Sequence, residues 1–327
     1  MKLLDKNSQF SMVLGKFSKV QGLNALLPLL LVVLFFTLMS DNFFSSYNIM
    51  NILRQAAVYA IMGTGMTFVI LTGGIDLGQG SVLAFSSVIC AMVINATGNM
   101  YLGILAALAT GALIGIMNGV MIAYVRLPAF IMTLGTMYIV RGVTLWITNS
   151  TQVNVKGAAA FTFIGQGFLF GIPFPVYIFV IVGALAVFFL TKTSTGRSIF
   201  AVGSNVTSAR LSGVKVERTL IISYTLSSLC VALAGVVYLA RLTAAQPTAG
   251  NGYEMEAIAA AVVGGTSLAG GEGGVLGTLI GAIIITIIRN GLVIIGVGSY
   301  FTQIVVGVII VIAVTFDVVR QRVSANK

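Results

Sequence analysis

Long apolar runs, separated by short polar stretches, make up most of the chain. Residues 20–40, 55–75 and 219–240 contain no charged side chain. Each run is close to the roughly 20 residues that a helix needs to cross about 30 Å of hydrocarbon. The uncharged run 77–125 is too long for one crossing, and polar residues at 95–99 interrupt it where a turn is expected. The pattern therefore predicts helices that span a membrane.

Over the whole chain the same pattern predicts about ten transmembrane helices in an all-α, polytopic membrane protein. They are expected near residues 23–39, 52–71, 79–94, 101–123, 129–148, 173–190, 219–240, 254–268, 274–295 and 301–318. The first apolar run is longer than the core of a secretory signal and lacks a small-residue cleavage site, so it is expected to remain as a helix. Residues 1–327 are expected to form one transmembrane domain.

Composition and charge agree with this interpretation. Hydrophobic residues make up 58% of the chain and charged residues 8%, which excludes a water-soluble globular domain. With the N-terminus in the cytoplasm, thirteen of the eighteen Lys and Arg residues fall on the cytoplasmic side. The positive-inside rule then predicts that both termini are cytoplasmic. The net charge of +10 is explained by topology, and no nucleic acid partner is expected.

Glycines recur at every fourth position in two predicted helices, at Gly111, Gly115 and Gly119 and again at Gly277 and Gly281. Small residues at this spacing allow helix backbones to approach closely in lipid. They predict tight helix packing.

Residues 191–219 form the one long, charged connection between predicted helices, on the cytoplasmic side. Helix connections in compact bundles usually have about 2 to 8 residues, so this segment is longer than a simple linker requires. Asn205 or Thr207 can cap a short helix that ends at Leu211, with Gly213 as its terminating residue. The segment is expected to be a cytoplasmic docking element, and a solvated loop is the alternative.

The sequence lacks the phosphate-loop motif that commonly binds ATP. No GxxxxGK[ST] phosphate loop occurs, so ATP binding by that route is excluded, and no enzymatic or metal site is predicted. There is no histidine, and most of the eight carboxylates lie near predicted segment ends. The carboxylate of Asp76 is explained as a helix cap. These features disfavour proton-coupled transport and favour an external motor.

Two arginines, Arg141 and Arg289, lie within apolar segments. Intramembrane charge indicates a water-filled path or a buried ion pair. The alternative is that each side chain reaches the outer headgroups. A passive channel is disfavoured because no charged ring or carbonyl filter motif is present.

Several stretches together resemble a known family. They are NFFSSYNIMNILRQ, AIMGTGMTFVILTGGIDLGQGSVLA, PAFIMTLGTMYIVRGVT, GRSIFAVGSNVTSARLSGVKVERT and ARLTAAQPTAGNGYEMEAIAAAVVGGTSLAGGEGGVLGTLIGA. The chain resembles the membrane permeases of the ribose, xylose, galactose and autoinducer-2 branch of ABC importers over nearly its whole length. ARLTAAQPTAGNGYE resembles the ribose members in particular. Gln79 and Gly78 depart from the family pattern, where valine and serine are more usual, which puts only local helix capping in doubt.

The resemblance implies a permease in the bacterial inner membrane that imports a sugar, with ribose as the expected sugar and another pentose, a hexose or autoinducer-2 as alternatives. It implies a homodimer with cytoplasmic ATPase subunits, which bind the ATP and Mg, and a periplasmic sugar-binding protein. The permease chain itself would hold no cofactor. The implied ATPase contacts are Gly203, Asn205, Ala209, Arg210, Leu211, Ser212 and Gly213.

The transport path is expected to offer weak hydrogen bonds and aromatic faces to a neutral sugar, because tight binding would slow release. Asn118, Tyr138 and Arg141 are the candidate residues that line it. Residues 241–252 are expected to form an outer loop that meets the binding protein, and residues 264–274 a tight glycine turn at the inner face. An exporter, a proton-coupled symporter and a passive channel are the rival functions.

Overall fold

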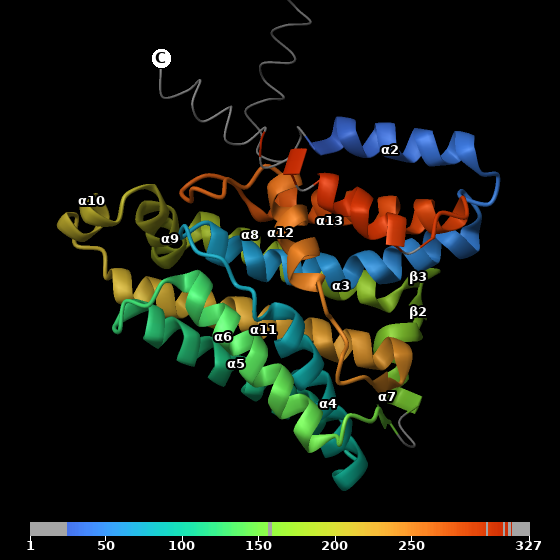
Figure 1. Cartoon of the computed structure of the whole chain (residues 1–327), viewed down its shortest axis with the longest axis horizontal. Helices are drawn as coiled ribbons and strands as arrows, with labels where there is room; N and C mark the ends of the chain where they lie inside the picture. Colours follow the sequence, from blue (N-terminus) through green and yellow to red (C-terminus); the bar gives the residue numbers. More distant parts are fainter. Residues whose placement is uncertain (1–24, 156–158, 299, 310, 313–314, 316–327) are drawn as a thin grey trace, which may run out of the picture.

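The computed structural model describes residues 25–155, 159–298, 300–309, 311–312 and 315, and there the chain is predominantly helical (Figure 1). The main helices are α2 (Leu26–Met39), α3 (Ser46–Ile70), α4 (Gln79–Thr97), α5 (Met100–Ala123), α6 (Ala129–Ile147), α7 (Ala159–Gln166), α8 (Phe174–Lys192), α9 (Ser194–Ser204), α10 (Val206–Leu211), α11 (Val216–Leu242), α12 (Tyr253–Val263) and α13 (Val275–Ile294). A further helix runs over Tyr300–Ile309.

The described residues also contain two small antiparallel sheets, each of two-residue strands. One pairs β1 (Val153–Asn154) with β4 (Ala244–Ala245), and the other pairs β2 (Phe168–Leu169) with β3 (Ile172–Pro173). The first sheet joins the connection after α6 to the connection after α11. The strands therefore hold loops together and leave the architecture helical.

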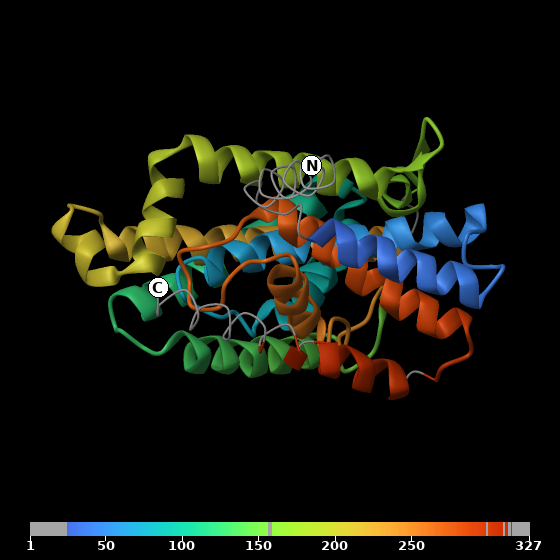
Figure 2. The ribbon, with the colours of Figure 1, turned by 90° about the horizontal axis from the view of Figure 1, so that it is seen from above.

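In the described part of the chain, seven helices are long and apolar enough to cross a membrane, namely α3, α4, α5, α6, α8, α11 and α13. The expected span at 254–268 is wrong. Helix α12 has only 11 residues, about 16 Å at 1.5 Å per residue, and cannot cross the bilayer. It lies across the long helices in Figure 1 and is seen nearly end-on in Figure 2. Residues 1–24 lie outside the described residues, as do residues 310, 313–314 and 316–318 of the last expected span.

Helix α3 occupies the centre of the bundle. It packs against α8, α11, α12 and α13, and 83% of its most apolar 18-residue stretch is buried. Small side chains and glycines along its length, such as Ala56, Ala60 and Gly63, leave room for these neighbours on all sides.

The expected glycine packing in the fourth predicted helix is confirmed. Helix α5 lies on α11, and a β-carbon at Gly115 would stand 2.6 Å from the Tyr224 carbonyl oxygen. A β-carbon at Gly119 would stand 2.6 Å from the Ile221 α-carbon. Larger side chains at these positions would force the two backbones apart, which explains the repeat.

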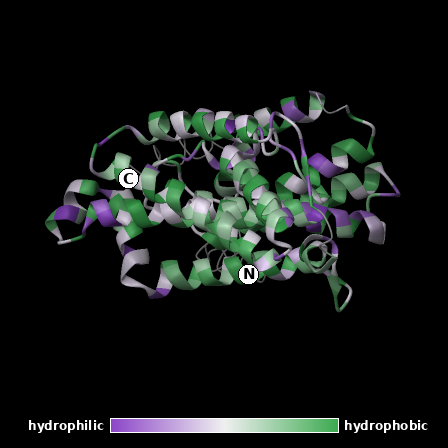
Figure 3. Cartoon of the chain, turned by 90° about the horizontal axis from the view of Figure 1, so that it is seen from below, coloured by the Kyte–Doolittle hydropathy of each residue, from purple (hydrophilic) through white to green (hydrophobic). Residues whose placement is uncertain are grey.

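Polar residues gather at the two ends of the bundle, while apolar residues cover most helix surfaces between them (Figure 3). Helices α9 and α10 project from one end (Figure 1). This distribution is the one expected of a protein whose long helices run across a bilayer.

Candidate functional site

The chain between α3 and α4 turns back into the bundle instead of ending at its surface. Gln79, the first residue of α4, places its Nε2 atom 3.5 Å from the Met62 carbonyl oxygen. Met62 lies eight residues before the end of α3, so residues 71–78 return about 12 Å along that helix. Helix α4 therefore begins inside the protein, and non-helical backbone reaches membrane depth.

A buried hydrogen-bond chain holds this segment to α11. Gln79 Nε2 donates to Ser227 Oγ at 3.0 Å, and Ser227 Oγ donates to Asp76 Oδ2 at 3.0 Å. Asp76 Oδ1 accepts from the Gly78 amide at 3.0 Å. The carboxylate of Asp76 thus binds near the start of α4, as expected, but it also bonds to α11. Gln79 is fully buried, so its departure from the family pattern affects the core as well as capping.

A second non-helical segment enters from the opposite end. Residues 246–252 run from β4 to α12, and Gly250 packs directly against Gly80. The expectation that all of residues 241–252 form an outer loop is therefore wrong. Non-helical backbone at membrane depth occurs only where protein or a water-filled cavity covers it, and broken helices commonly surround substrate sites in transporters. Segment 246–252 meets the start of α4 at such a place.

The intramembrane arginines are directed inward. Arg141 Nη1 donates to the Pro247 and Ala249 carbonyl oxygens, at 2.6 and 2.8 Å. Arg289 Nε lies 3.4 Å from Glu256 Oε1, and its Nη1 donates to the Tyr59 hydroxyl at 2.9 Å. For both arginines, these contacts favour a buried partner over the alternative in which the side chain reaches the outer headgroups. Arg141 holds the entering segment in place.

The three candidate path residues are not brought together as one site. Asn118 is buried, and its Oδ1 accepts from Thr136 Oγ1 at 2.6 Å. The Tyr138 side chain is exposed on α6, and Arg141 is bonded to backbone. Of the three, Tyr138 has the side chain that is free to meet a solute.

The sequence interpretation missed two buried carboxylates. Glu254 and Glu256 lie in the first turn of α12, as expected, but are only 7% and 5% exposed. The two intramembrane arginines were the signal that could have identified them, because a buried cation requires a nearby anion. Among the described residues, no cluster of three or more His, Cys, Asp or Glu side chains is placed to hold a metal ion.

The predicted docking segment contains two helices, α9 and α10. Asn205 Oδ1 accepts from the Ser208 amide at 2.8 Å and caps α10, and Gly213 has the positive φ of a terminating glycine. Leu211 is 85% exposed, while Ala209 is buried among apolar side chains.

The remaining predicted docking residues differ in their placement. Arg210 forms an ion pair with Glu217 on α11, and Ser212 is exposed beside it. Gly203 packs against the backbone of two other segments. A β-carbon on Gly203 would overlap the Leu71 carbonyl oxygen and lie 2.5 Å from the Gly271 amide nitrogen. Among the predicted docking residues, Leu211 offers the largest free apolar side chain.

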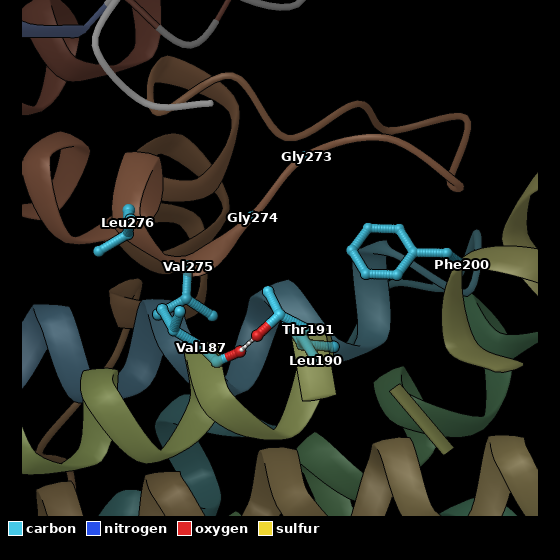
Figure 4. Close-up of a pocket in the computed structure, with 8 residues that line it drawn as sticks. All are labelled: Val187, Leu190, Thr191, Phe200, Gly273, Gly274, Val275 and Leu276. Atoms are coloured by element: carbon cyan, nitrogen blue, oxygen red, sulfur yellow. Dashed lines mark hydrogen bonds between the residues drawn. The ribbon is translucent and has the colours of Figure 1, made fainter. Parts of the chain in front are cut away.

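Gly203 lies where two turns meet. The Gly271 amide donates to the Leu71 carbonyl oxygen at 3.0 Å, which joins the expected glycine turn 264–274 to the turn after α3. Nearby, Phe200 of α9, Gly273, Val275 and Leu190 of α8 are among the residues around a small cavity of about 70 Å³ (Figure 4). Helix α9 is thus in direct contact with both turns.

Comparison with known proteins places the chain in a family. Residues 48–314 match the family described as branched-chain amino acid transport system / permease component. The ribose import permease protein RbsC of Escherichia coli (strain K12) is 47% identical over 91% of this chain and 94% of its own length. The Bacillus subtilis (strain 168) protein of the same name is 42% identical over 91% and 93%.

A third relative is the D-allose transport system permease protein AlsC of Escherichia coli (strain K12), 38% identical over 88% of each chain. No solved structure matches the chain significantly. The family match covers most of the chain and agrees with its apolar spanning helices. The chain is therefore a multi-pass inner-membrane protein that belongs to this family of transport-system permease components.

Proposed function

We propose that the chain is the transmembrane permease subunit of an ATP-driven sugar importer and that its sugar is ribose. The observation that carries the proposal is the 47% identity to a ribose import permease over 91% of the chain. Similarity to a D-allose permease at 38% identity supports another monosaccharide as the second candidate.

Transport would require partners. A second copy of the chain, cytoplasmic ATP-binding subunits that bind ATP and Mg, and a periplasmic sugar-binding protein would complete the importer. Helix α6 and the helix Tyr300–Ile309 lie on one side of the molecule (Figure 2). Exposed apolar side chains on α6, such as Tyr138 and Trp146, support that side as the face toward the second copy.

The mechanism would be alternating access. ATP binding and hydrolysis in the partner would move α10, and α9 would transmit the movement because it contacts the turns at Leu71 and Gly271. The turn at Leu71 begins segment 71–78, which leads into α4, and the turn at Gly271 connects α12 to α13. Movement at the docking end would therefore reach the start of α4, where Gly80 meets Gly250 of segment 246–252.

Restoring the chain to cells that lack only their own ribose permease is expected to restore uptake of labelled ribose. Uptake should be lost when the ATPase is inactivated, and unlabelled ribose should compete more strongly than xylose, galactose or allose. A protonophore added at constant ATP should leave uptake unchanged, because the proposed driving force is ATP hydrolysis. Uptake that follows the proton gradient, or that equilibrates without ATP, would contradict the proposal.

Leu211→Ser is expected to weaken binding of the ATPase subunit at least tenfold. The side chain is 85% exposed, so the change should cost little folding energy. Burying a leucine at an interface contributes about 1.5 to 3 kcal/mol, and each 1.4 kcal/mol is a factor of ten in affinity. The measurement is the amount of ATPase that co-purifies with the permease.

Leu242→Ser is the matched control, because Leu242 is 42% exposed at the opposite end of α11. It should leave co-purification unchanged. Arg210→Ala, which removes the ion pair with Glu217, should reduce co-purification and uptake while leaving the fold intact. Normal ATPase recovery with both Leu211→Ser and Arg210→Ala would show that α10 is not the docking element.

A further inference from the structure

A cavity of about 430 Å³, lined by both polar and apolar residues, lies between the start of α12, α13 and the helix Tyr300–Ile309. Its volume falls within the range of about 300 to 1,000 Å³ that is usual for small-molecule sites. The residues that line it are Asn251, Gly252, Met255, Glu256, Arg289, Gln303, Val306 and Gly307. None of them is among the path residues expected from the sequence.

The carboxylate of Glu256 is only partly satisfied. Its residue is 5% exposed, and Oε1 lies 3.4 Å from Arg289 Nε. Among the described residues, no group donates a hydrogen bond to Oε2. An acceptor buried without a donor is costly, and in a membrane protein such a group indicates a functional site. Glu256 lines the cavity, so a hydroxyl group of a bound ligand can supply the missing donor once the carboxylate turns toward the cavity.

The chemistry of the cavity matches a neutral polyhydroxy compound. Glu256 and Arg289 have opposite charges, so the pair adds no net charge for a neutral ligand to compensate. Asn251 and Gln303 are exposed and line the same cavity, and their amides can each donate and accept hydrogen bonds. Met255 and Val306 supply apolar surface for the carbon-bearing faces of a sugar ring.

The position of the cavity agrees with this chemistry. Asn251 and Gly252 belong to the entering segment 246–252, which meets the start of α4 through Gly250 and Gly80. Sites formed at broken helices are common in transporters because exposed backbone and side-chain polar groups meet there. We propose that this cavity binds one monosaccharide during transport, with Glu256 Oε2 accepting a hydrogen bond from a sugar hydroxyl. The proposal rests on the importer function proposed above.

Cysteine protection tests the site directly. Gln303→Cys and Ile304→Cys are placed singly in a chain that also carries Cys90→Ala and Cys230→Ala. Gln303 lines the cavity, whereas its neighbour Ile304 is 60% exposed and does not. The variants are reconstituted with the ATPase and the binding protein in vesicles. Ribose with Mg-ATP should slow maleimide labelling at position 303 at least threefold and leave position 304 unchanged.

Equal labelling at position 303 with and without ribose, or an equal change at both positions, would overturn the proposed site. Glu256→Gln should in addition reduce ribose uptake at least tenfold at normal membrane levels, and uptake within twofold of the unmodified chain would also overturn the proposed site.

Uptake by the unmodified chain in the same vesicles separates the proposed site from the proposed importer function. If that chain takes up ribose while position 303 is unprotected, the site is wrong and the importer function stands. If it takes up no ribose, the proposed function fails.

Discussion

Gly80→Ala is expected to prevent most of the chain from accumulating as folded protein. The added β-carbon would overlap the Gly250 carbonyl oxygen and the Glu254 carboxylate, so segment 246–252 could no longer pack against the start of α4. Neither neighbour can withdraw easily, because one is backbone and the other is a buried side chain. We expect a cost above the usual overpacking penalty of about 1 to 3 kcal/mol. The measurement is the yield and melting temperature of detergent-solubilised, monodisperse protein.

The matched control is Gly142→Ala on α6. No atom lies within 4 Å of a β-carbon at Gly142. Because alanine favours helix over glycine by about 1 kcal/mol, this variant should be as stable as the unmodified chain or more so. Equal melting temperatures for Gly80→Ala and Gly142→Ala would mean that segment 246–252 does not pack against Gly80.

Gly203→Ala is expected to reduce ribose uptake at least tenfold while the ATPase still co-purifies. The added β-carbon would overlap the Leu71 carbonyl oxygen and crowd the Gly271 amide, so α9 would be displaced from both turns. The exposed end of α10, with Leu211, is not part of this contact. This variant should therefore still bind the ATPase but transport poorly, because the changed contact lies between the docking helix α10 and the two turns.

Ser198→Ala is the control on the same helix. Ser198 is half-buried, and its hydroxyl donates to the Ser194 carbonyl within α9, so its loss should change neither uptake nor ATPase recovery. Size-exclusion profiles of both variants establish that the comparison is between folded proteins. Uptake within twofold of normal for Gly203→Ala, or loss of the ATPase together with uptake, would contradict the proposed route through α9.

Most helix positions could be predicted from the sequence because the bilayer places simple requirements on any segment that crosses it. A segment that crosses the bilayer must be apolar and long, and must satisfy its backbone hydrogen bonds internally. The expected spans at 101–123 and 129–148 agree closely with α5 and α6. The capped helix α10 was also predictable, since its cap and terminating glycine act over a few neighbouring residues.

The broken segments could not be predicted in the same way. Residues 71–78 and 246–252 differ little in composition from ordinary loops, and only the contacts of Gln79 and Gly250 show that they enter the bundle. The error at α12 has the same cause. An apolar stretch that lies across other helices is as hydrophobic as one that crosses the membrane, because both are surrounded by apolar neighbours.

The sequence alone therefore determined that lipid surrounds the protein, the helical class, most of the spans, the capped helix α10 and the resemblance to a family. These properties depend on composition, on periodicity and on motifs of neighbouring residues. Only the tertiary structure decided which polar groups meet. Asp76 binds Ser227, 151 residues away, and Glu256 pairs with Arg289 on another helix. Such partners are set by how helices pack in three dimensions, and no local pattern records that arrangement.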